Sequence, residues 1–249
     1  MSPMIKDLSL SVALTFAASS ALAEPTHVMV RAQAQDAKFI GDHMGGVQVT
    51  LTDARTGEVL AKGLTKGGTG DTPRIMKTPR TRGMGLTDPS AAGFEAVLDL
   101  KKPTLVRVDA VGPVGKPDSA IKVSSTQWIL PGRDIVGDGW MLNFPGLVIE
   151  PTTSVSPDGA LRISAKVSLM CGCPIEPGGI WNADTYKVEA HLMQGDRDVA
   201  TAVLIYAGQP SQFSGTVAPA PAGRYRLRLI AADATTSNAG VVEVPVRLR

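Results

Sequence analysis

The sequence predicts an all-β protein made of two β-sandwich domains in tandem, and three observations lead to this fold class. The 249 residues include 26 glycines and 18 prolines, while charged residues make up 19% and aromatic residues 4%. Low charge with many β-branched residues and frequent turn formers is typical of all-β domains. Short apolar or alternating runs recur between turn signals at regular spacing. No segment of useful length shows the period of an α-helix.

The first 23 residues have the features of a secretory signal peptide. A basic stub with Lys6 precedes an apolar stretch from residue 8 to 22, and the segment ends in the small-residue motif Ala21-Leu22-Ala23. The stretch is shorter than the roughly 20 residues of a membrane-spanning helix and contains Ser and Thr, which disfavours a membrane anchor. We therefore expect cleavage after Ala23, no membrane span, and a periplasmic or secreted protein.

Thirteen strands are expected along the mature chain, separated by turns with recognisable chemistry. The turns at Asp53–Gly57 and Pro157–Gly159 combine an Asp with a glycine that can adopt positive φ. The strands expected in the first half cover residues 27–34, 46–52, 58–64, 93–100, 104–111 and 120–127. Those expected in the second half cover residues 147–151, 160–170, 185–193, 199–206, 213–217, 225–232 and 241–248.

The least regular stretch, residues 131–151, is where we expect the two domains to meet. We place the boundary near Phe144 and Pro145. The N-terminal sandwich then covers residues 24–145 and the C-terminal sandwich covers residues 146–249. The second domain carries a Cys-Gly-Cys-Pro loop.

Two parts of the chain resemble known β-sandwich families. GGVQVTLTDARTGEVLAKGLT, followed later by AGFEAVLDLKKPTLVRVDAVG, resembles the prealbumin-like and carboxypeptidase-regulatory-like sandwiches in its strand, D-x-x-T-G turn and second strand. PAGRYRLRLIAAD resembles a late strand of immunoglobulin and fibronectin type III domains, with Tyr225 at the position of their tyrosine corner. These resemblances imply a fold and not a function, because such sandwiches carry unrelated activities.

Motifs of several common enzyme classes are missing from the sequence. It contains neither G-x-S-x-G nor H-E-x-x-H, and GGTGDT at residues 67–72 lacks the lysine and following helix of a phosphate-binding loop. We expect that segment to be a hairpin or loop. Three histidines leave little room for a multi-histidine metal enzyme, and a net charge of +2 is too small to imply nucleic-acid binding. A non-enzymatic role is therefore favoured.

Both cysteines lie in the segment SLMCGCPIEPGGIW, where a strand pattern runs into a Pro- and Gly-rich loop. Cys171 and Cys173 admit three interpretations: a disulfide, a pair of thiolate ligands for a soft metal, or a thiol-exchange centre. Gly172 lets the backbone bend enough for the disulfide, which can be purely structural. We expect the two Cα atoms within ~7 Å of each other. We also expect the pair on an accessible loop outside the core, with Trp181 packed over it.

Each of the three histidines has a methionine beside it, as His27-Val28-Met29, His43-Met44 and His191-Leu192-Met193. Residues i and i+2 of a strand share a face, so such a pair offers an imidazole and a thioether together. Imidazole, thioether and thiolate form a ligand set that suits copper, above all Cu(I). The pairs are similar in ligand type to the sites of periplasmic copper chaperones. In the alternative interpretation, methionines fill gaps in the core and the histidines are incidental.

Strand alternation predicts which of these side chains can meet. It places His191 and Met193 on the polar face of their strand and directs Met170 outward beside Cys171. His191 lies about six residues from the loop end of its strand, on the order of 20 Å away, so we expect no single cluster with the cysteines. The remaining candidates for completing a metal site are Met170, His43, Met44, Met76 and Met84.

Arg224, Arg226 and Arg228 share the outer face of one expected strand. They could meet an acidic partner protein, but a solvated outer face is the favoured explanation. No sequence feature indicates the oligomeric state. Taken together, the sequence predicts an exported, non-enzymatic binding or accessory protein with a soft-metal site, copper by preference, at Cys171 and Cys173. A thiol–disulfide redox protein and an interaction scaffold with a structural disulfide are the alternatives.

Overall fold

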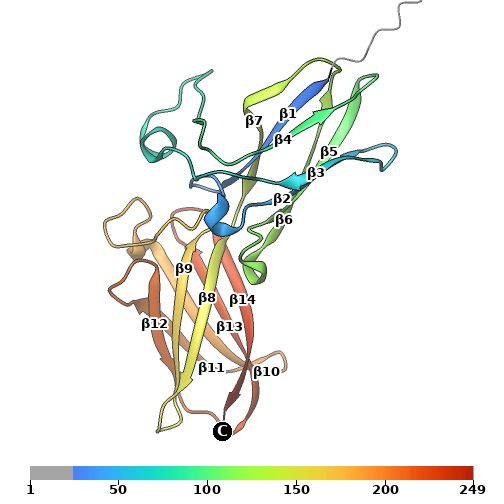
Figure 1. Cartoon of the computed structure of the whole chain (residues 1–249). Helices are drawn as coiled ribbons and strands as arrows, with labels where there is room; N and C mark the ends of the chain where they lie inside the picture. Colours follow the sequence, from blue (N-terminus) through green and yellow to red (C-terminus); the bar gives the residue numbers. More distant parts are fainter. Residues whose placement is uncertain (1–24, 249) are drawn as a thin grey trace, which may run out of the picture.

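The computed structural model describes residues 25–248, so the expected signal peptide lies outside the described part. Fourteen strands and four short helical turns make up its regular structure, which confirms the all-β fold class (Figure 1). The thirteen expected strands each match an observed strand. Within residues 25–248, no helix has the length and apolar character needed to cross a membrane.

The first half of the molecule contains two sheets, with strand orders β4-β1-β7 and β3-β2-β5-β6. The pairing of β1 with β7 is parallel, and the other pairings in these sheets are antiparallel. Alternating side chains of β1, β2 and β5 are buried, as expected for strands that face a shared core. The elements are β1 (Thr26–Ala34), η1 (Asp42–Met44), β2 (Gln48–Asp53), β3 (Val59–Leu64), η2 (Pro73–Lys77), β4 (Phe94–Leu98), β5 (Thr104–Gly112), η3 (Pro117–Ser119), β6 (Ile121–Ile129) and β7 (Ile135–Phe144).

The second half forms one seven-stranded antiparallel sheet with the order β14-β13-β10-β11-β12-β9-β8. Its end strands β14 and β8 approach each other, so the sheet curls into a nearly closed barrel (Figure 1). The three sheets of the described residues are together consistent with a β-sandwich fold, and an immunoglobulin-like arrangement of the second half stays a prediction. The elements are β8 (Leu147–Val155), β9 (Leu161–Leu169), η4 (Ala183–Thr185), β10 (Tyr186–Gln194), β11 (Arg197–Tyr206), β12 (Gln212–Val217), β13 (Gly223–Asp233) and β14 (Ala239–Leu248).

Strand β7 is the one strand that the sequence analysis missed. Its sequence IVGDGWMLNF contains the turn-like run Gly137-Asp138-Gly139, and both glycines have φ of 70°. The run makes a bulge, because the register with β1 shifts between Val28 and Val30. The bulge presents Asp138, whose carboxylate accepts backbone hydrogen bonds from Leu86 and Thr87 at 2.9–3.0 Å. The turn-like residues inside β7 therefore concealed, at the level of sequence, a strand that holds the long loop containing Leu86 and Thr87.

That loop, residues 65–93, is further held by the buried Arg31 of β1. The guanidinium donates to the carbonyls of Ala91, Ala92 and Gly137. Burial lowers the pKa of Arg31, and the nearby carboxylates of Asp138 and Asp88 oppose that shift. The GGTGDT segment lies in this loop, as expected, and the short η2 turn follows it directly.

The two halves meet at an extensively bonded junction. The chain leaves the first half when β7 ends at Phe144 and enters the second when β8 begins at Leu147. The Ser119 hydroxyl accepts from the Ile149 N–H at 3.1 Å, and the Asn238 amide donates to the Gln35 carbonyl at 2.9 Å. Buried side chains form a continuous cluster that runs through both halves. The junction is therefore packed, and a domain boundary near residue 145 stays a prediction.

Tyr225 adopts the arrangement that the sequence suggested. Its hydroxyl donates to the carbonyl of Pro221 at 2.7 Å, while its ring is buried on the inner face of β13. A tyrosine that bonds upstream backbone at the start of a strand is the arrangement of a tyrosine corner. The assignment of the second half to the immunoglobulin-like sandwiches remains a prediction.

Candidate functional site at the Cys171–Cys173 turn

The two cysteines lie in a tight turn directly after β9. They form a disulfide, and their Cα atoms are 5.4 Å apart, which confirms the expected proximity. The Gly172 N–H donates to the Leu169 carbonyl at 2.7 Å and closes the turn. Gly172 has φ of 71°, in the left-handed region that a side chain disfavours.

The cysteines are buried, so the prediction of an accessible loop is wrong. Cys171 has 0% and Cys173 has 4% of its surface exposed. The alternation of β9 continues only to Val167, and the following residues from Ser168 to Cys171 are all buried. The reason is tertiary: this end of β9 lies at the junction, where His43 and Met44 of the first half lie against the turn and Asp36 accepts a hydrogen bond from Trp181.

Met170 corrects a second expectation about the same turn. Strand alternation predicts that Met170 points outward, but this residue is 1% exposed and belongs to the continuous core. Its Cε lies against Gly146, where an added Cβ would come within 2.4 Å of it. Met170 thus packs in the core at the junction, and a metal site at the cysteines would need other donor atoms.

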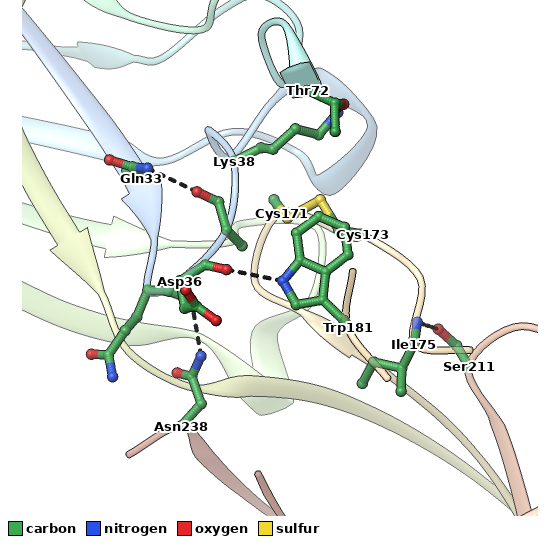
Figure 2. The surroundings of a disulfide bond; sticks show 12 residues. Gln33, Asp36, Lys38, Thr72, Cys171, Cys173, Ile175, Trp181, Ser211 and Asn238 are labelled. Atoms are coloured by element: carbon green, nitrogen blue, oxygen red, sulfur yellow. Dashed lines mark hydrogen bonds between the residues drawn. A yellow bond between two sulfur atoms is a disulfide. The ribbon is translucent and has the colours of Figure 1, made fainter. Parts of the chain in front are cut away.

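Trp181 packs beside the Cys-Gly-Cys turn, as the sequence predicted. Its indole is 8% exposed and lies beside the disulfide (Figure 2). Its Nε1 donates to the Asp36 carbonyl at 2.9 Å, a bond from the second half to the first. The loop is also tied down within the second half, since Ile175 and Ser211 exchange two hydrogen bonds of 3.1 and 2.7 Å. The turn is therefore held from both halves.

His43 and Met44 come from the first half and lie directly against Gly172. A Cβ added to Gly172 would be 2.6 Å from His43 Nε2 and 2.7 Å from Met44 Sδ. Allowing about 1.5 Å for the added carbon–carbon bond, both atoms lie within about 4.5 Å of the Gly172 Cα. The η1 turn presents the pair, with Met44 buried and His43 exposed. An imidazole and a thioether thus flank the centre of the Cys-Gly-Cys turn.

A cleft of about 350 Å³ opens beside the disulfide. Its walls include Lys38, His43, Thr69, Thr72 and Trp181, and both cysteines contribute to its lining. The Lys38 ammonium donates to the Thr72 hydroxyl at 2.9 Å (Figure 2). No sequence pattern indicates Lys38 or Thr72, because they lie far before the cysteines in the chain and match no motif.

The other two His–Met pairs lie away from the turn and have other partners. His27 lies at the end of β1 that is far from the junction, and its Nδ1 is 3.0 Å from Glu95 Oε1. His191 Nδ1 is 2.9 Å from Asp198 Oδ2 on the outer face of β10. Met29 packs against Gly93 beside His27. These pairs are therefore separate from the cysteines, as the strand geometry predicted for His191.

Met193 lies on the polar face of β10, as expected, but it is 3% exposed. It is opposite Arg226 in the register of β10 with β13, and the Arg226 guanidinium reaches Gly195 and Asp196. Met193 is also outside the main core cluster. Met193 is thus buried on the polar face, opposite a charged residue, which an alternation pattern cannot reveal.

The remaining methionine candidates belong to the long loop. Met76 packs partly buried against the small cluster formed by Phe39, Ile75, Leu86, Ala91 and Ala92. Met84 is half-buried in the same loop. Residues 25–248 contain no group of three or more His, Cys, Asp or Glu side chains arranged to hold a metal ion. A metal site at the turn therefore has to draw on the Met44 thioether as well as on the cysteines and His43.

Tyr186, Asp233 and Asp36 are ionisable groups at the junction whose pKa values are displaced, and burial raises that of Asp36. Burial raises the pKa of Tyr186, and the charges of Asp233 and Asp36 add to the effect. Burial acts to raise the pKa of Asp233 too, but hydrogen bonds from Thr235 and Thr236 outweigh it and lower that pKa. The Asp233 carboxylate therefore stays charged in a mostly buried position near the start of β10.

Two of the three arginines in the β13 row have acidic partners within the chain. Arg226 contacts Asp196 and Glu243 at 3.2 Å, and Arg228 contacts Glu243 at 2.7 Å. These contacts favour the interpretation of the row as an outer, solvated face, where each ion pair adds little stability.

Comparison with known proteins adds no assignment to these observations. No protein-family model matches the chain, and no curated protein sequence matches it. The functional argument therefore depends on the geometry of the turn.

Proposed function

We propose that this chain is an exported, non-enzymatic binding or accessory protein that holds one soft metal ion, Cu(I) by preference, at the reduced Cys171–Cys173 turn. His43 and Met44 supply the further donor atoms. The observation that carries the proposal is the position of His43 Nε2 and Met44 Sδ against Gly172, between the two cysteines.

The donor set decides the choice of metal. Two thiolates and a thioether are soft ligands that favour Cu(I), while Mg²⁺ and Ca²⁺ prefer oxygen ligands. Zinc sites use Cys, His and carboxylate ligands and do not use the Met thioether. Burial of both cysteines supports the same choice, since a site shielded from water protects the oxidation-sensitive Cu(I) state.

The proposed ligands come from both halves of the chain, so the metal site requires the two halves to be packed together at the junction. We infer two sandwich domains that meet near residue 145, the first prealbumin-like and the second immunoglobulin-like. The passage of the chain from one sheet to another between Phe144 and Leu147 supports this division, and the Tyr225–Pro221 bond supports the second assignment. We infer export from the Ala21-Leu22-Ala23 motif. A protein that binds Cu(I) through thiolates suits a periplasmic or extracellular location.

A thiol–disulfide redox protein is the second candidate, because the cysteines are bonded beside an open cleft. A scaffold with a structural disulfide is weaker, since a ring closed over three residues removes little chain entropy.

A Cu(I) titration of the mature protein tests the proposal. The protein is reduced with a phosphine and titrated under anaerobic conditions against a chromophoric Cu(I) chelator. We expect one tightly bound Cu(I) for the wild type, and no tight binding for the double variant Cys171→Ser, Cys173→Ser. Equal copper binding by both proteins contradicts the metal site. Catalysis of thiol exchange above that of a small dithiol would then favour the redox candidate.

A further inference from the structure

The oxidised turn poses a problem of access. The disulfide must be reduced before the thiolates can bind a metal, yet the cysteines are 0% and 4% exposed. A protein reductant needs to bring its own sulfur into contact with a disulfide sulfur, and the surrounding chain obstructs such an approach. The cleft of about 350 Å³ beside the disulfide offers a route of the size of a small molecule.

The chemistry of the cleft selects the charge of that molecule. Lys38, His43, Thr69 and Thr72 line it, and no lining residue is acidic. Within residues 25–248, Lys38 has no carboxylate partner within ion-pair distance. Its ammonium donates one hydrogen bond, to the Thr72 hydroxyl. Asp42 and Asp71 are neighbours of His43 and Thr72 in sequence, but neither lines the cleft. The walls therefore offer a free positive charge and hydroxyl groups, which favour a small anion.

From these observations we propose that a small anionic thiol, one that carries a carboxylate or sulfonate, enters the cleft and reduces the Cys171–Cys173 disulfide. This inference rests on the proposed function, because it explains how the buried metal-binding dithiol is produced. Lys38 holds the anionic group, and the Trp181 ring forms the apolar wall beside the disulfide.

The reaction consumes two thiol molecules. The first thiolate attacks the sulfur of Cys173, the more exposed cysteine, and the bond between Cys173 and Cys171 breaks. Cys171 leaves as a thiolate with the electron pair, and Cys173 carries a mixed disulfide. A second thiolate attacks the small-molecule sulfur of that mixed disulfide and releases Cys173 as a thiolate. The protein disulfide gains two electrons, and two thiols become one small-molecule disulfide.

A charge series of thiols tests the proposal on the full mature chain. The probes are 2-mercaptoethanesulfonate (anionic), 2-mercaptoethanol (neutral) and cysteamine (cationic), with rates divided by thiolate concentration. The same rates on an oxidised peptide with the sequence of residues 168–176 correct for intrinsic reactivity. After this correction we expect the anionic thiol to react about 10-fold faster than the cationic thiol at low salt, because one unpaired charge acts nearby.

Two lysine variants locate the effect. Lys38→Gln should remove most of the preference for the anionic thiol, and Lys38→Arg should retain it. Lys166→Gln is the matched control, because Lys166 is an exposed lysine of β9 outside the cleft and its loss should leave the preference unchanged. Thermal unfolding of each variant checks that it is folded.

Three outcomes overturn the proposal. They are equal corrected rates for the three thiols, a preference that survives Lys38→Gln, and reduction by a protein dithiol that is much faster than by any small thiol. Copper binding is measured on protein reduced beforehand with a phosphine, so failure of the thiol route and failure of the metal site give different results.

Discussion

His43–Met44 and His191–Met193 carry the same two side chains, yet the structure gives them opposite surroundings. His43 and Met44 face the Cys-Gly-Cys turn across the junction. His191 Nδ1 lies 2.9 Å from Asp198 Oδ2, and Met193 is opposite Arg226, which belongs to an ion-pair network. The comparison shows that a ligand motif becomes a candidate site only when a second segment brings further donors to it.

The largest expected difference between the two regions is in copper affinity. The double variant His43→Ala, Met44→Leu should weaken Cu(I) binding about 100-fold or more, since loss of outer partners alone costs 10–100-fold in metal sites. His191→Ala, Met193→Leu should change the affinity less than about 2-fold, because that pair lies further along β10 and away from the turn. Competition with a Cu(I) chelator measures both. A comparable loss in the second variant would refute the assignment of the ligands.

Alanine substitutions at two glycines, one in each region, should differ in their effect on the free energy of unfolding. Gly172 and Gly195 both have positive φ, of 71° and 63°. A Cβ on Gly195 would meet nothing within 4 Å, whereas one on Gly172 would crowd His43 and Met44. Gly195→Ala should therefore cost about 1–2 kcal/mol from backbone strain alone. Gly172→Ala should cost about 1 kcal/mol more, from overpacking.

Denaturant unfolding of the two alanine variants measures the difference. Equal losses of stability would mean that His43 and Met44 do not pack against the turn in solution.

A smaller effect is expected in the pH dependence of the free energy of unfolding, through the Asp233 carboxylate at the junction. Because hydrogen bonds lower the pKa of Asp233 in the folded state, its stabilising contribution is present above the unfolded pKa of about 3.9 and is lost as the pH falls through the folded pKa. Asp233→Asn should lower stability by about 1 kcal/mol at pH 7. The difference from the wild type should shrink as the pH falls below about 3.9 and the folded-state carboxylate becomes protonated.

Unfolding curves of the two proteins across this range provide the measurement. Asp198→Asn, beside His191, is a control at the far end of the sheet. A difference for Asp233→Asn that grows towards low pH would contradict the hydrogen-bonding explanation.

The strand predictions succeeded where local chemistry decides the structure. Alternation and turn residues located thirteen strands, because side-chain direction in a strand has a period of two and the turns carry glycines at positive φ. Strand β7 was not predicted, because Gly137 and Gly139 form a bulge inside it. This bulge directs Asp138 towards another segment, the loop that contains Leu86. A local pattern cannot distinguish such a bulge from a turn.

The sequence by itself determined the all-β class, the closeness of Cys171 and Cys173, and the inventory of sulfur and imidazole donors. Only the tertiary structure decided that the cysteines and Met170 are buried and that His43 and Met44 meet Gly172. The physical reason is the range of the interactions. Backbone geometry and side-chain alternation are properties of neighbouring residues, whereas burial and ligand assembly depend on the first half of the chain packing over the end of β9.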